Sequence, residues 1–170
     1  FVYDVTTGMW HERLHWDSAI GIWEGFRGRS HTFAFGKHLI GDWKTGKIYE
    51  MSTDIFTDDG EPLRRLRVAP HITDGLRRIS FPEFRLNIQV GVGNVNDIDP
   101  HIDMRTSNDG GMTWSNSRSR SVGAAGHYKE MVRWMQCGEA RRRAFEVSTS
   151  MDAPCTLLDA YLPGLYEAND

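Results

Sequence analysis

The sequence predicts an all-β protein, with propeller-like blade hairpins first and then a β-rich region that is either sandwich-like or made of further blades. Three observations predict this class. A hairpin motif occupies residues 107–114, a turn-bearing segment near the start of the chain is repeated, and apolar and polar residues alternate in several runs, including residues 83–90, which read as a strand with one buried face. Helical spacing is scarce, and the one short helix candidate covers residues 127–135, where Val132 and Trp134 suit a strand equally well.

The hairpin motif fits the pattern Ser-x-Asp-x-Gly-x-Thr-Trp, called the Asp-box, which recurs in β-propellers. We expect the carboxylate of Asp109 to accept hydrogen bonds from its own turn, while the adjoining glycines supply the positive φ of a tight hairpin. The motif specifies a fold element rather than chemistry, and a cation or sugar contact at Asp109 is the alternative. The motif residues are Ser107, Asp109, Gly111, Thr113 and Trp114.

The repeat lies near the start of the chain, where residues 3–12 align with residues 41–50. Each copy reads as a strand, an Asp-x-x-Thr-Gly turn and a second strand. The turns run from Asp4 to Gly8 and from Asp42 to Gly46. Because propeller blades repeat at about 40 residues and need neighbours to bury their faces, this spacing favours blade hairpins.

A turn-rich stretch at residues 58–62 marks a boundary. We therefore expect propeller-blade-like hairpins in residues 1–62 and a β-rich domain with the Asp-box hairpin in residues 63–170. The six tryptophans, spread along the hairpins, are expected in blade cores, and one or two of them could instead stack on sugars. Further strands are expected at residues 31–36, 38–42, 63–69, 78–92, 101–107, 143–150 and 155–162, with a turn at 138–140.

Charge is distributed unevenly along the chain. The 20 basic and 23 acidic residues give a net charge of −3, which argues against a general nucleic-acid binder. Residues 63–150 hold 14 basic and 9 acidic residues, a net of +5, between two ends that each carry −4. Such a section fits either solvated sheet faces or contacts with acidic partners. The candidate interface residues are Arg64, Arg65, Arg141 and Arg142.

Residues 11–15 read His-Glu-Arg-Leu-His, the spacing of a zinc-protease motif. On a helix both imidazoles reach one zinc ion, but on a strand four residues span about 13 Å, too far for one metal. The preceding turn at Gly8 and the strand-like repeat partner favour a strand, so we expect no metal site. The other histidines show no metal-ligand spacing, and Asp58 with Asp59 and Asp97 with Asp99 read as turn residues rather than as catalytic pairs.

The sequence contains no complete motif for a serine hydrolase or a dinucleotide cofactor. A Gly-x-Ser-x-Gly elbow is absent, and Gly91-Val92-Gly93 lacks the rest of a dinucleotide fingerprint. Cys137 and Cys155 cannot form a disulfide framework, and no apolar run is long enough to cross a membrane. We expect synthesis in a reducing cytoplasm, and the start at Phe1, inside a strand, suggests a piece of a longer protein.

Six segments in this order resemble the C-terminal part of packaged-DNA-stabilisation proteins, the tail-hub subunits of short-tailed phages. The opening Phe-Val-Tyr-Asp-Val-Thr-Thr-Gly-Met-Trp-His-Glu-Arg is the most distinctive, and together they cover nearly the whole chain. They are residues 1–13, 36–42 with 46–50, 59–65, 90–93, the 107–114 hairpin and 160–162.

The resemblance implies a structural virion protein of the phage tail, made in the host cytoplasm. Such subunits form a homo-oligomeric ring, typically a hexamer, below the portal and its adaptor protein. They extend the channel, help to retain the packaged DNA and present surfaces to the tail needle and tailspikes. The DNA passes through without specific binding during ejection, and the family brings no catalytic residues, cofactor or membrane contact.

Two other functions remain open from the residues. A carbohydrate-binding β-module for receptor binding would place exposed tryptophan or tyrosine on a concave face. A sialidase-like glycosidase fragment is suggested by the Asp-box, but six blades of about 40 residues need about 250 residues, more than this chain has.

Overall fold

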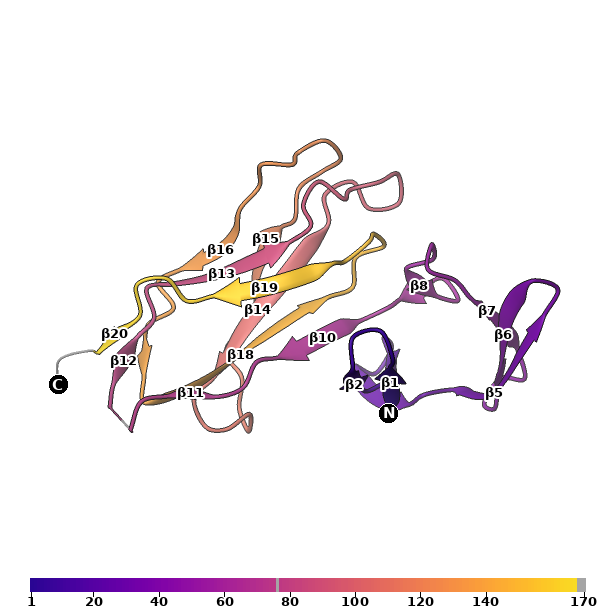
Figure 1. Ribbon diagram of the computed structural model, residues 1–170, viewed down its shortest axis with the longest axis horizontal. Helices are drawn as coiled ribbons and strands as arrows, with labels where there is room; N and C mark the ends of the chain where they lie inside the picture. Colours follow the sequence, from indigo (N-terminus) through magenta and orange to yellow (C-terminus); the bar gives the residue numbers. More distant parts are fainter. Residues whose placement is uncertain (76, 168–170) are drawn as a thin grey trace. The chain divides into compact units, whose positions relative to one another are not determined.

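The computed structural model describes residues 1–75 and 77–167 and divides the chain into two compact units, Phe1–Pro62 and Leu63–Asp170 (Figure 1). All regular elements of the described residues are β-strands, which confirms the all-β prediction. Of the two alternatives left open for residues 127–135, a short helix or a strand, the structure has the strand, Val132–Met135. Among the described residues there is also no helix suited to span a membrane.

The first unit is a succession of antiparallel hairpins joined by short turns. Each strand pairs with a neighbour in sequence, so all pairing within this unit is local. This is expected because turn-forming Asp and Gly residues recur every few residues between the strands. The hairpins are β1 (Val2–Asp4) with β2 (Met9–His11), β3 (Leu14–Asp17) with β4 (Ile22–Gly25), the three-stranded β5 (Gly28–Ala34), β6 (Lys37–Asp42) and β7 (Ile48–Met51), and β8 (Thr57–Asp58) with β9 (Glu61–Pro62).

This unit has no hydrophobic core of its own. Of residues 1–62, all of which the structure describes, only His15 and Asp42 are buried. Large apolar side chains are instead exposed, including Trp10 at 69% and Phe35 at 94%. Two- and three-stranded sheets without a buried face are marginal in water, so the first unit needs a further surface to cover it.

The second unit is a sandwich of two main sheets, drawn one behind the other in Figure 1. Most pairings join strands that are distant in sequence, and β18 lies inside its sheet. One sheet has the order β10 (Arg65–Val68), β18 (Arg142–Thr149), β14 (His101–Ser107), β15 (Arg118–Ser121), with β11 (Ile72–Thr73) also on β18; the other has the order β16 (Val132–Met135), β13 (Glu83–Ile88), β19 (Leu157–Tyr161). A small third sheet has the order β17 (Glu139–Ala140), β12 (Ile79–Ser80), β20 (Tyr166–Glu167).

The core lies between the two main sheets. Phe84 of β13 stacks on Phe145 of β18, with ring centres 4.6 Å apart and planes 6° from parallel. Trp134 is fully buried beside them, and its indole N–H donates to the carbonyl of Arg118 at 2.6 Å. The sandwich therefore supplies the buried apolar surface that the first unit lacks.

The alternation expected in β13 is confirmed, because Phe84, Leu86 and Ile88 are buried and Asn87 is exposed. Glu83 departs from this alternation, because its side chain is buried. Its two carboxylate oxygens accept hydrogen bonds from the guanidinium of Arg85, both at 3.2 Å.

Three other expectations, two for this unit and one for the whole set of tryptophans, are wrong. The single strand expected over residues 78–92 breaks into β12 and β13 at Pro82, which has no N–H to donate to a ladder. The turn expected at 138–140 contains strand β17, which pairs with β12. The tryptophans are not generally in cores, since Trp134 is fully buried but Trp10 and Trp43 are 69% and 56% exposed.

Candidate interaction surface

The hairpin after β14 is held by a compact set of side-chain hydrogen bonds. Asp109 accepts from the backbone N–H of Thr113 at 2.9 Å, and its second oxygen accepts from the Thr113 hydroxyl. The hydroxyl of Ser107 donates to Asp109 at 2.8 Å and accepts from the N–H of Gly111 at 2.8 Å. Gly110 and Gly111 have φ of 89° and 92°, values that other residues rarely adopt.

These bonds determine the electrostatics of the turn. The Thr113 hydroxyl, then the Thr113 amide and Ser107, hold the pKa of Asp109 well below its usual range. The carboxylate is therefore committed to its own turn. Behind the turn, Trp114 lies against Arg105, whose guanidinium carbon is 5.1 Å from the indole centre.

The two repeat turns of the first unit have the same hydrogen bonds. Asp4 accepts from the N–H and hydroxyl of Thr7, and Asp42 accepts from the N–H and hydroxyl of Thr45. The closing residues Gly8 and Gly46 have φ of 69° and 70°.

Sequence reasoning missed a third turn of this kind, which runs from Asp17 to Gly21. Asp17 accepts from the N–H of Ala19 and Ile20, and Gly21 has φ of 68°. The Asp-x-x-x-Gly spacing of residues 17–21 could have predicted this turn, although it lacks the threonine of the two repeat turns.

Among the candidate interface arginines, Arg64 and Arg65 lie at the start of β10 and are partly buried. The guanidinium of Arg65 donates to the backbone carbonyls of Met151 and Ala153. Burial of this group lowers its pKa. Arg65 therefore stabilises its own domain by linking the start of β10 to the segment after β18.

The arginine run 141–143 divides into an exposed pair and a buried residue. Arg141 and Arg142 are exposed, whereas Arg143 is 4% exposed. Arg143 donates to the side-chain oxygen of Asn108 at 2.9 Å, to the carbonyl of Glu139 at 3.1 Å and to the carbonyl of Cys137. It therefore ties the 107–114 hairpin to β17.

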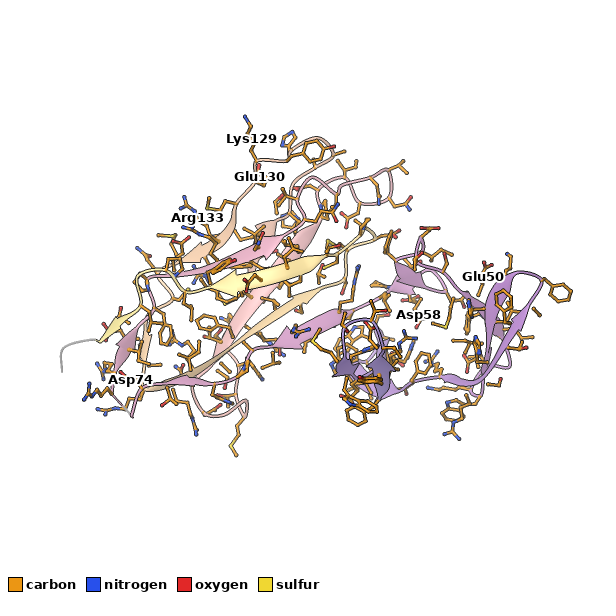
Figure 2. All side chains as sticks on the ribbon, in the orientation of Figure 1. Glu50, Asp58, Asp74, Lys129, Glu130 and Arg133 are labelled. Atoms are coloured by element: carbon orange, nitrogen blue, oxygen red, sulfur yellow. The ribbon has the colours of Figure 1, made fainter. Side chains whose placement is uncertain are left out.

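An open hollow lies beside this buried arginine. Its lining comes from the residue before β12, from the hairpin loop, from β17 and from the start of β18. Asp74, labelled in Figure 2, marks the same end of the sandwich, because its neighbour Thr73 pairs with Arg142. The hollow brings Arg141 and Arg142 together with Arg78 and Asn108, which sequence reasoning had not singled out. The lining residues are Arg78, Asn108, Glu139, Ala140, Arg141 and Arg142.

The His-Glu-x-x-His spacing forms no metal site. His11 ends β2 and His15 lies in β3, strands of different sheets, and the Nδ1 of His15 is 2.9 Å from a carboxylate oxygen of Asp58. Within the described part of the chain, no group of three or more His, Cys, Asp or Glu side chains is arranged to hold a metal ion.

The first unit also contains a hollow of about 410 Å³ with aromatic and charged walls, including Trp16 and Tyr49. Its polar groups are largely paired with one another. Asp58, labelled in Figure 2, contacts His15, and the ammonium group of Lys47 contacts Asp59. This hollow therefore presents few uncommitted polar groups to a ligand.

Residues 64–163, more than half of the chain, match the family model described as "Bacteriophage P22 Gp10, beta-sandwich". The chain belongs to this family. The matched residues lie within the second unit and include both main sheets of the sandwich. No curated protein matches the chain.

Membership of the Gp10 family confirms the resemblance to the C-terminal part of short-tailed-phage tail hubs. The protein is accordingly a structural component of a phage tail and belongs to the virion. The sandwich carries the match, so the exposed arginines at its end are on a phage-tail domain.

Proposed function

We propose that the protein is a tail-hub subunit that assembles as a ring below the portal and its adaptor. In that position it extends the channel, helps to retain packaged DNA and docks the tail needle and tailspikes. The observation that carries this proposal is that one chain contains both a Gp10-family sandwich and a first unit without a hydrophobic core. A unit that exposes its apolar side chains suits a subunit that functions within an assembly.

The hairpins of the first unit fit blade elements of a β-propeller. Their local antiparallel pairing and their Asp-to-Gly turns agree with that architecture. The hydrogen bonds of the 107–114 turn likewise agree with an Asp-box used as a structural device. In this proposal neither feature takes part in catalysis, and the protein is not an enzyme.

The charge of the chain suits a channel component that lets DNA pass. A net charge of −3 provides no general attraction for phosphate, which suits a component that DNA passes without being held. A carbohydrate-binding module is less well supported, because the aromatic hollow of the first unit has its acidic and basic groups paired with each other.

Native mass spectrometry of the protein, alone and with its portal–adaptor complex, tests the proposal. A ring, or a monomer that becomes a ring on the adaptor, supports the tail-hub assignment. A stable monomer that ignores the adaptor contradicts it, and a glycan array then becomes the next measurement.

A further inference from the structure

Two histidines of the first unit lie side by side on the hairpin formed by β5 and β6. The Nε2 atom of His31 is 3.0 Å from the Nδ1 atom of His38, and the two rings are 21° from parallel. Both side chains are exposed, so ions in the solvent reach them directly. The two residues are seven apart in sequence, which is longer than the spacing of common metal motifs. The pair is therefore a product of the fold.

The turn of the hairpin brings the two histidines together. Its two central residues, Phe35 and Gly36, have φ of 55° and 75°, the positive values that type I′ hairpin turns require. This turn determines the register in which Phe33 of β5 lies opposite His38 of β6. His31 is then the diagonal neighbour of His38 on the same face, a position that long side chains can bridge. The ring of Phe33 packs against that of His38, with ring centres 4.9 Å apart, and restricts its orientation.

The separation of the two nitrogens matches that of two imidazoles bound to one metal ion. With metal–nitrogen bonds of about 2.0–2.1 Å, the nitrogens stand about 2.9 Å apart at a right angle and about 3.3 Å apart at the tetrahedral angle. The observed 3.0 Å is close to the first value, which is that of tetragonal Cu²⁺ and Ni²⁺ sites. A small rotation of each exposed ring turns both lone pairs toward one ion, while each neutral ring carries its proton on the other nitrogen.

The surrounding residues select the class of metal. Strands β5, β6 and β7 contain two acidic residues, and both have partners. Glu50 accepts from Lys37 at 2.6 Å, and Asp42 accepts from its own turn. The pair therefore offers imidazole nitrogen, which suits copper, nickel and zinc rather than magnesium or calcium. Met51 of β7 lies opposite His38 and places a thioether, a ligand type of copper sites, on the same face.

We infer that His31 and His38 bind one divalent late transition-metal ion, Cu²⁺ in preference to Ni²⁺ or Zn²⁺. The ligands are Nε2 of His31 and Nδ1 of His38, and water completes the coordination. Copper is preferred because it stands at the top of the general order of divalent-metal affinities. The ion joins β5 to β6, so it stabilises a hairpin in a unit that has no hydrophobic core. This site does not depend on the ring proposed for the tail hub.

Titration of the full chain with copper(II) chloride, after removal of any polyhistidine tag, tests the site. Calorimetry should show one saturable copper site per chain, and the electron paramagnetic resonance spectrum should show splitting from two nitrogen ligands. His31→Gln and His38→Gln each remove one imidazole from an exposed position. Each should weaken copper binding at least about tenfold, the lower end of the loss caused by removing a hydrogen-bond partner of a metal ligand. The matched control, His11→Gln, changes an exposed histidine of β2 and should bind copper like the original protein.

Nuclear magnetic resonance of the original protein gives a second measurement that needs no variant. Because Cu²⁺ is paramagnetic, a substoichiometric amount should broaden the ring signals of His31 and His38 before those of the other histidines. This measurement decides the question if the two substituted proteins fail to fold.

Four results would overturn the inference. They are the absence of a saturable copper site, copper binding that neither His31→Gln nor His38→Gln weakens, equal weakening by His11→Gln, and broadening that begins at other histidines. In each case the two imidazoles form only a hydrogen bond with each other. None of these results bears on the tail-hub proposal, which native mass spectrometry tests separately.

Discussion

The guanidinium group of Arg105 in β14 forms a bidentate ion pair with the carboxylate of Glu146 in the neighbouring strand β18. The Nη2–Oε2 distance is 3.0 Å, and the Nε donates to the other carboxylate oxygen. The Glu146 side chain is 4% exposed and that of Arg105 is 34% exposed, so the arginine covers the acid. Trp114 of the hairpin lies over the guanidinium in turn. The hairpin and the outer face of the sheet are thus linked through one ion pair.

Arg105→Ala is expected to lower the free energy of unfolding by about 2–4 kcal/mol. The change leaves the buried Glu146 carboxylate without its partner, and the partial exposure of Arg105 keeps the loss below that of a fully buried pair. Urea unfolding followed by circular dichroism measures it. Arg67→Ala, an exposed arginine in neighbouring β10, is the control and should change stability by about 0.5 kcal/mol or less. Equal losses in both variants would contradict the structural role of the pair.

Truncation of two tryptophans should lower the free energy of unfolding by very different amounts. Trp134 is fully buried in the core, so Trp134→Ala is expected to cost about 3–5 kcal/mol through lost burial and a cavity. Trp43 is 56% exposed and lies under Arg29, so Trp43→Ala should cost about 1 kcal/mol or less. Urea unfolding followed by circular dichroism measures both. A large loss from Trp43→Ala in the isolated chain would show that the first unit is covered in solution.

What could be predicted from the sequence depends on how local the determinant is. β14 was predicted at its observed bounds, 101–107, and the inward face of β13 followed from period-two alternation. The turn at Asp109 was predicted because its hydrogen bonds join residues at most four apart. In each case the determining contacts or pattern lie within one short segment.

The errors arose where tertiary context decided the outcome. Nothing local separates Arg143 from Arg141, because the burial of Arg143 depends on contacts with Asn108, 35 residues away, and with Cys137, in the segment before β17. The break at Pro82 could have been read from the missing N–H. The exposure of the first unit's tryptophans could not have been predicted from the sequence, because the pattern of a hairpin assumes a neighbour that covers each hydrophobic face.

Arg143→Lys is expected to lower the melting temperature and to loosen the 107–114 hairpin. A lysine has one nitrogen at its end and cannot bond the Asn108 side chain and the Cys137 and Glu139 carbonyls together. Limited proteolysis should then cut the hairpin faster, while thermal unfolding reports the global loss. Arg142→Lys, at the exposed neighbour, should leave both measurements unchanged. Faster cutting in Arg142→Lys would mean that the exposed pair, and not Arg143, holds the hairpin.

The lowered pKa of Asp109 predicts a specific acid dependence of stability. Because the folded pKa lies below the unfolded value of about 3.9, ionised Asp109 stabilises the fold above that value. This contribution is lost as the pH falls toward the folded pKa. The stability difference between the original protein and Asp109→Asn should therefore be constant near neutral pH and shrink below about pH 4.

Thr113→Val identifies the cause of this behaviour, because the Thr113 hydroxyl is the largest contributor to the lowered pKa. Removing that donor should move the Asp109 pKa back toward its ordinary range in an NMR titration of its carboxyl carbon. The acid loss of stability should then begin at a higher pH than in the original protein. A Thr113→Val protein whose Asp109 titrates as before would show that the backbone amide and Ser107 suffice, and that the threonine of the motif serves the strand rather than the turn.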